Sequence, residues 1–222
     1  MAHLRPPPVR TRLPIMMRSA PLVALLVLAA CLPGTHAGAQ GATPAGLGDT
    51  VPPGFGSLRR DDITLRFATP QLQLQILPLD ERVIRLLAPD TYQSLEQLIQ
   101  SKQKDITDAA ARSGISNPTL VLVTFYGQSP GARFSPEDVQ VQSRGRLFRP
   151  VATVPLSPTW GTLQLDLRQQ AVAIYLFEDG LNWSEDASVD YQGAQATWSH
   201  SFQLLQQERA RVRARAQSQP NP

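Results

Sequence analysis

Apolar and polar residues begin to alternate at about residue 61, with the two-residue period of a β-strand. The clearest alternation covers residues 71–76, where glutamines separate Leu72, Leu74 and Ile76. This pattern predicts a half-buried strand whose glutamine face meets water. A similar alternation at 63–67 predicts another strand just before it.

Helical spacing interrupts the strands at about 80–113. Asp80 opens a short apolar-periodic stretch, and Asp90 or Thr91 is placed to cap a second, longer helix through its short side-chain acceptor. Gly114 is a suitable residue to end that helix. We therefore expect a helical insertion inside the β domain.

The rest of the domain, which we place at 58–195, is expected to be mainly β. Residues 119–126 and 171–177 are apolar at nearly every position, as in central strands that are covered on both faces. Weaker strand signals are found at four further positions: 138–143, 146–154, 162–167 and 188–192. Many short strands separated by turn residues favour a β-sandwich.

The pattern becomes helical again near the C-terminus. Over 196–216 the apolar residues recur at helical spacing, and the residues that fall roughly on one face are Trp198, Phe202, Leu205, Arg209 and Val212. We expect a C-terminal helix there, followed by a polar, disordered tail at 217–222.

The first 39 residues are expected to be an export signal. Arg18 precedes an apolar run that is shorter than the roughly 20 residues of a membrane-spanning helix. A basic residue, a short apolar run and small residues are typical of a secretory signal peptide. Cleavage after Ala39, in an Ala-Gly-Ala sequence, is one of two processing sites that stay open.

The other site is cleavage before Cys31. The sequence Leu28-Ala-Ala-Cys31 resembles the lipobox of bacterial lipoproteins. That resemblance implies a lipid anchor on Cys31, which would hold the exported protein on a membrane. Residues 31–57 contain 15 Gly, Ala or Pro residues out of 27. We therefore expect 40–57 to be a flexible linker in either case.

The net charge of +3 depends on the leader. Residues 1–30 hold four arginines and no acid, so the remaining 17 basic and 18 acidic residues give −1. The C-terminal helix carries arginines at every second position from Arg209 to Arg215, which places them on two flanks of a helix. Without interleaved aromatics they favour an anionic membrane surface over nucleic acid. Envelope proteins are the other expected partners.

Few residues are suited to catalysis or metal binding. One cysteine excludes an intrachain disulfide, and the globular part has one histidine, His200. A serine nucleophile would therefore lack its usual base. The acidic stretch 178–186 does not match the calcium-loop spacing. We expect no cofactor, no metal and no catalytic residue.

Two alternatives stay open for the acidic stretch, where Glu178, Asp179 and Trp183 form a candidate ligand-facing loop. Its carboxylates could serve a hydrolase, although sequence cannot give their separation. Trp183 and Trp160 could stack on sugar rings in a carbohydrate-binding module, or they could close the ends of an apolar core.

The order of motifs after residue 119 resembles one known family. Strand 120–126 is followed by Phe134-x-x-x-Asp138, by Arg144-Gly-Arg-Leu-Phe-Arg-Pro150 and by strand 171–177. This order is similar to the telokin-like, immunoglobulin-like domains of bacterial secreted proteins and lipoproteins, over roughly 119–192. The resemblance implies an extracytoplasmic immunoglobulin-like sandwich and supplies no catalytic residue. We expect an exported envelope protein that serves as a non-catalytic binding, scaffolding or assembly module.

Overall fold

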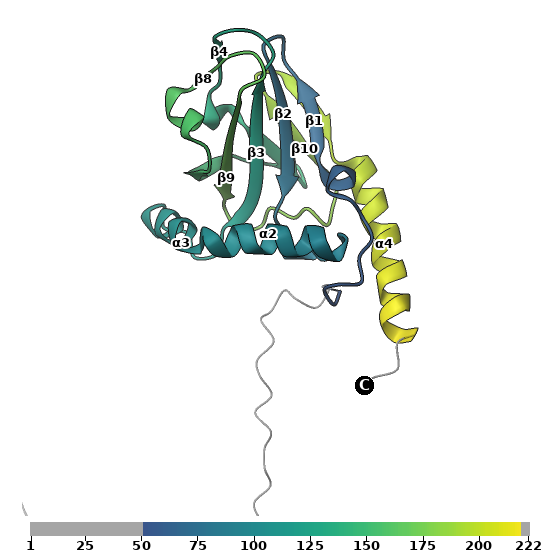
Figure 1. The fold of residues 1–222 in the computed structure, drawn as a ribbon. Helices are drawn as coiled ribbons and strands as arrows, with labels where there is room; N and C mark the ends of the chain where they lie inside the picture. The colour runs from purple at the N-terminus through teal and green to yellow at the C-terminus, as the bar shows by residue number, and fades with distance from the viewer. Residues whose placement is uncertain (1–50, 219–222) are drawn as a thin grey trace, which may run out of the picture. The chain divides into compact units, whose positions relative to one another are not determined.

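The computed structural model describes residues 51–218 of the 222-residue chain. Its largest element is a five-stranded antiparallel sheet in the strand order β1-β2-β3-β9-β7 (Figure 1). The strands are β1 (Leu65–Ala68), β2 (Leu72–Pro78), β3 (Thr119–Gly127), β9 (Gln170–Phe177) and β7 (Pro150–Pro155). The two most apolar runs of the sequence thus form β3 and β9, which both have neighbours on each side, as predicted.

A second antiparallel sheet has the strand order β11-β10-β5-β6. Its strands are β5 (Gln140–Ser143), β6 (Arg146–Phe148), β10 (Ala187–Tyr191) and β11 (Ala194–Thr197). Two-residue turns join β5 to β6 at Arg144-Gly145 and β10 to β11 at Gln192-Gly193, and all four turn residues have positive φ. Such turns match the right-handed twist of the paired strands.

The inner faces of the two sheets share one aromatic core. Phe125 of β3 lies with its ring centroid 5.4 Å from that of Tyr191 of β10 and 4.8 Å from that of Phe134. Trp160 completes the cluster, 5.8 Å from Tyr175 of β9. All five side chains are buried. The predicted mainly β architecture is therefore confirmed at the level of two antiparallel sheets packed face to face, with additional helices.

Short elements fill the ends of this core. They are η1 (Arg60–Ile63), β4 (Ala132–Arg133), η2 (Pro136–Asp138), η3 (Pro158–Thr162) and β8 (Gln164–Leu165). The predicted strand at 162–167 is wrong for most of its length. Leu163 adopts a left-handed conformation (φ 51°) after η3, so the alternation breaks there. Leu163 and Leu167 are consequently exposed, and only Leu165 reaches the core.

The predicted strand at 146–154 is two strands in different sheets. It divides at Arg149, between β6 and β7, where Pro150 follows. Proline has no N–H for the sheet ladder and restricts the residue before it to extended conformations. The chain therefore leaves the second sheet at this point and enters the first.

The helices between β2 and β3 lie within the expected insertion at 80–113. They are α1 (Glu81–Ile84), α2 (Pro89–Ser101) and α3 (Gln103–Arg112). The Asp80 side chain accepts a hydrogen bond from the Arg82 N–H and so caps α1. The expected cap by Asp90 or Thr91 is wrong, because α2 already begins at Pro89, whose missing N–H needs no partner. Lys102 separates α2 from α3.

Residues 51–57 do not behave as the flexible linker expected for 40–57. Val51 is buried, and the Arg85 guanidinium donates to its carbonyl oxygen. A Cβ on Gly56 would lie 2.2 Å from the backbone carbon of Leu86, so only glycine permits this close approach. Close packing in this segment is found at Val51 and Gly56, whereas Pro52, Pro53 and Gly54 are exposed.

The C-terminal helix α4 (Ser199–Ser218) runs beside this segment (Figure 1). Leu205 and Val212 are fully buried, and Arg209 is 4% exposed, so the predicted buried face is confirmed. Among residues 51–218 no helix combines the length and apolar character needed to cross a membrane.

Candidate functional site

A hollow in the surface of the described chain lies beside α3. One face of this helix is buried through Ile106, Ala109 and Ala110. The groove lies between this helix and the chain that leads into β3, and the small side chains of Ala110 and Ala111 form part of its lining.

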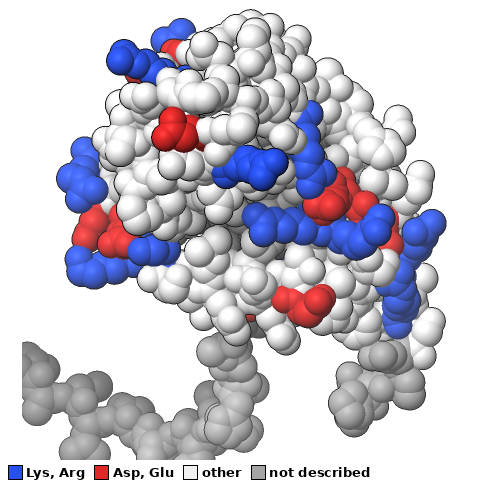
Figure 2. Space-filling model, turned by 45° about the horizontal axis from the view of Figure 1, so that its top comes forward, with Lys and Arg blue, Asp and Glu red and all other residues white. Residues whose placement is uncertain are grey.

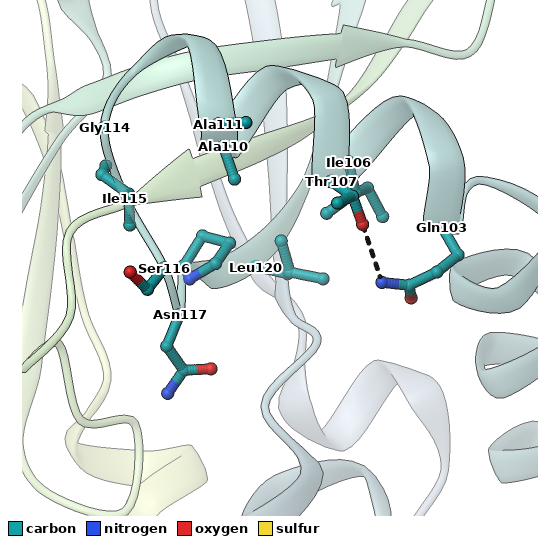
Figure 3. A pocket seen from close by; sticks show the side chains of 11 residues that line it. Gln103, Ile106, Thr107, Ala110, Ala111, Gly114, Ile115, Ser116, Asn117 and Leu120 are labelled. Carbon is teal, nitrogen blue, oxygen red and sulfur yellow. Dashed lines mark hydrogen bonds between the residues drawn. The ribbon is translucent and has the colours of Figure 1, made fainter.

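The C-terminus of α3 builds one wall of this groove. Gly114 has φ +70°, and its N–H donates to the Ala111 oxygen, while the Ile115 N–H donates to the Ala110 oxygen. This pair of bonds is the Schellman motif, in which a left-handed glycine reverses the chain and satisfies the last helical carbonyls. Ile115 consequently folds back toward Ala110 (Figure 3). The predicted role of Gly114 as the helix stop is confirmed.

The groove has a volume of about 650 Å³, which lies within the usual range for small-molecule sites. Its lining mixes apolar side chains with uncharged amides and hydroxyls (Figure 3). The lining residues are Gln103, Ile106, Thr107, Ala110, Ala111, Gly114, Ile115, Ser116, Asn117, Pro118 and Leu120. The Gln103 amide donates to the Thr107 hydroxyl at 3.3 Å. None of these side chains is titratable.

The acidic residues of the candidate ligand-facing loop do not converge. Glu178 is paired with Arg146 at 2.7 Å, and Glu185 is paired with Arg144. Asp179 accepts a hydrogen bond from the N–H of Gly180, within its own turn. Each carboxylate therefore has a separate local partner. No group of three or more potential metal ligands occurs among residues 51–218.

Trp183 faces the core and not a ligand, which corrects its assignment to that loop. Its indole is 0% exposed and packs edge to face on Trp198, with ring centroids 5.2 Å apart. The Trp198 Nε1–H donates to the Trp183 carbonyl oxygen at 2.9 Å. Trp160 is buried in the aromatic core. An indole without an exposed face cannot stack on a sugar ring, so both residues belong to the core.

His200 is exposed in the first turn of α4. No hydroxyl of the described chain is paired with it among the hydrogen bonds given by the structure. Cys31, the candidate lipidation site, and the export signal lie outside the described residues.

A buried polar centre, which is separate from the groove and which the sequence did not predict, lies where α4 meets residues 55–57. The Glu208 side chain is 1% exposed and accepts hydrogen bonds from the N–H and the hydroxyl of Ser57 at 2.9 and 2.8 Å. Arg215 donates to the same carboxylate at 3.0 Å and also to the Phe55 oxygen. Glu208 therefore links two segments that are 151 residues apart.

A signal for this centre was present in the sequence. Position 208 follows the buried Leu205 by three residues and precedes the buried Val212 by four, so it shares their face of the helix. A carboxylate on that face needs buried partners. The residues of the α3 groove carry no comparable signal, because their individual types are common in helices and loops.

Comparisons with known proteins give no relative for this chain. No protein-family model, no curated protein and no solved structure matches it.

Proposed function

We propose that this protein is exported to the cell envelope, and that its folded domain is a non-catalytic binding module. The export signal would be processed before Cys31, which leaves a lipid anchor, or after Ala39, which releases the chain. The binding surface would be the groove between α3 and the chain that enters β3.

The observation that supports binding without catalysis is the lining of the groove. It combines apolar side chains with neutral hydrogen-bonding groups, which suits recognition of an uncharged, largely apolar ligand. General acid–base and nucleophilic catalysis need titratable or nucleophilic side chains beside the substrate. The hydroxyls of Thr107 and Ser116 have no base within the lining that would activate them.

We also propose that the two sheets form an immunoglobulin-like sandwich. The chain passes from the first sheet (β3) to the second (β5, β6), back to the first (β7, β9) and again to the second (β10, β11). Repeated crossing between two facing antiparallel sheets is typical of such sandwiches. A crystal structure with the sheets about 30° apart would agree, and a crossing near 90° would contradict the proposal.

Binding at the groove can be tested with N-phenyl-1-naphthylamine, an uncharged apolar dye whose fluorescence rises in apolar surroundings. We expect saturable binding of one dye to the chain from Gln40 to Pro222. Ala111→Phe, which narrows the groove, should abolish it. Ala210→Phe is the matched control, because Ala210 is an exposed helical alanine in α4. Equal binding by both variants would contradict the assignment to the groove.

Export and processing need a separate measurement. Expressed in a Gram-negative host, the full chain should be recovered from the envelope or periplasm with a mature N-terminus at Cys31 or Gln40, as read by mass spectrometry. Membrane partition that is lost in Cys31→Ser would favour the lipid anchor. An intact leader on a protein that stays in the cytoplasm would contradict export.

A further inference from the structure

The charged residues of the described chain are divided unevenly between two parts of the molecule. Residues 51–66 and 208–218 together, which we term the basic end, hold seven arginines and three acids, a net charge of +4. Residues 67–207 hold ten basic and fourteen acidic residues, a net charge of −4. The described domain is therefore close to neutral but strongly polarised.

The basic end is one continuous place in the fold, although its two segments are far apart in sequence. Ser57 and Phe55 contact Glu208 and Arg215, and η1 packs against α4. Figure 2 shows blue side chains beside the grey C-terminal residues, and further blue groups elsewhere on the same face.

The three acids of the basic end are engaged locally. Asp61 is paired with Arg66 at 2.6 Å, and Asp62 lies 3.8 Å from Arg59. The third acid, Glu208, is a buried residue of α4. The side chain of Arg211 is 64% exposed and lies 3.7 Å from Glu208, and Arg213 is also exposed. Of the acids only Asp61 is well exposed, at 71%, so exposed guanidinium groups outnumber exposed carboxylates on this surface.

The basic end is also where the rest of the chain is attached. Val51, the first described residue, lies against Arg85. Twenty residues separate Cys31 from Val51, so even a fully extended chain could place the domain no more than about 70 Å from a lipid on Cys31. A tether of this kind raises the effective concentration of the domain at the membrane. The surface next to the attachment point is the one best placed to meet lipid.

We propose that the basic end docks on a membrane surface that contains anionic phospholipids, and that this contact orients the domain. Guanidinium groups are attracted to the negative surface, while the net negative remainder of the domain is repelled from it. The β4–β8 end, which lies at the opposite side of the domain from the end of α4 in Figure 1, would then point away from the bilayer. The inference rests on the proposed export to the envelope.

The test uses the unlipidated chain from Gln40 to Pro222, so that only protein–lipid contacts contribute. It is sedimented with vesicles of 30% phosphatidylglycerol in phosphatidylcholine, and with pure phosphatidylcholine. We expect binding to the first only, at 0.1 M salt. Binding should be lost at 1 M salt, where the screening length falls from about 10 Å to about 3 Å.

Three double variants distinguish vesicle binding by the basic end from binding by positive charge anywhere on the domain. Arg211→Gln with Arg213→Gln should weaken vesicle binding about 30-fold, whereas the matching lysine pair should keep it. Arg133→Gln with Arg168→Gln removes the same charge from exposed positions in β4 and after β8, and should leave binding within about 3-fold of wild type. Equal melting temperatures would show that all variants are folded.

Three results would overturn the inference. They are failure of the wild type to bind the anionic vesicles, equal loss in both glutamine pairs, and binding to a duplex DNA oligonucleotide as tight as binding to vesicles. Failure of export is a different outcome, since vesicle binding by the purified chain would persist. In that case the proposed function would fail while the lipid contact itself remained.

Discussion

The core between the sheets and the junction of α4 with residues 55–57 are both buried, but opposite kinds of side chain hold them together. The core packs Phe125 and Tyr191 against neighbouring rings and aliphatic side chains. The junction joins Glu208 to Ser57 and Arg215 through hydrogen bonds and charge. Apolar burial is a large and non-directional contribution to stability, whereas a buried ion pair adds little net stability and much geometric specificity.

This difference assigns separate roles to the two regions. The aromatic core accounts for the stability of the domain. The junction holds residues 55–57 against α4, and so keeps the two segments of the basic end together. A substitution in the core should therefore unfold the domain, and one in the junction should release a segment of it.

The largest effect is expected at the centre of the core. Phe125→Ala removes a fully buried ring that touches three others, and should cost about 3–5 kcal/mol of the free energy of unfolding. Urea denaturation measures this cost. Leu147→Ala is the control, because Leu147 is 52% exposed and its loss should change stability by less than about 0.5 kcal/mol. A cost below about 1 kcal/mol for Phe125→Ala would remove the distinction between the regions.

A smaller effect is expected at the junction. Glu208→Gln keeps the shape of the side chain but loses its charge, and hydrogen bonds that involve charged groups contribute about 1.5–3 kcal/mol each before solvent screening. Arg215 is 41% exposed, so we expect a cost of about 1–2 kcal/mol in total. Urea denaturation again provides the measurement.

The second readout at the junction is local. Release of residues 55–57 should speed tryptic cleavage after Arg59 and Arg60, as identified by mass spectrometry. Gly56→Ala, which clashes with the Leu86 backbone, should do the same by steric means. The comparison variant is Phe125→Leu, studied at a urea concentration that gives it the same free energy of unfolding as the junction variants. If it accelerates cleavage at these two sites equally, the junction has no separate role.

The sequence predicted the core better than the junction, for a physical reason. Alternating or continuous apolar residues identify a strand and its buried face directly, so β2, β3 and β9 were found with nearly correct bounds. Strand β11 was missed, because the Gln192-Gly193 turn before it is a weaker signal than Asn-Gly or Asp-Gly. Its residues were assigned partly to the C-terminal helix instead.

Composition misled the prediction where packing decides the structure. Residues 51–57 are rich in Gly and Pro, which describes flexible linkers and tightly packed segments equally well. Contacts in the folded chain, such as that between Gly56 and Leu86, distinguish the two. Trp183 was similarly ambiguous, since an aromatic residue in an acidic loop gives no information about the direction of its side chain. The α3 groove depends on the return of the chain after Gly114, a three-dimensional feature.

The smallest expected effect is a gain in the free energy of unfolding, from a substitution inside the core. The Tyr175 hydroxyl is buried without a hydrogen-bond partner among the described residues, whereas the Tyr191 hydroxyl accepts one from the Ser135 N–H at 3.0 Å. Tyr175→Phe should therefore raise the free energy of unfolding by up to about 1 kcal/mol. Tyr191→Phe should lower it by about the same amount, because it leaves the Ser135 donor unpaired.

The same pair differs at alkaline pH. Burial raises the pKa of Tyr175 well above its ordinary value of about 10. The folded state therefore favours the neutral phenol, which stabilises it fully below pH 10 and less as the pH rises above 10. Burial also raises the pKa of Tyr191, but the hydrogen bond from Ser135 opposes that change. Tyr175→Phe should accordingly flatten the loss of stability between pH 9 and pH 11 more than Tyr191→Phe does, as followed by urea denaturation at each pH. If Tyr175→Phe destabilises the protein at neutral pH, or leaves the alkaline loss unchanged, the core is not the purely apolar region that contrasts with the junction.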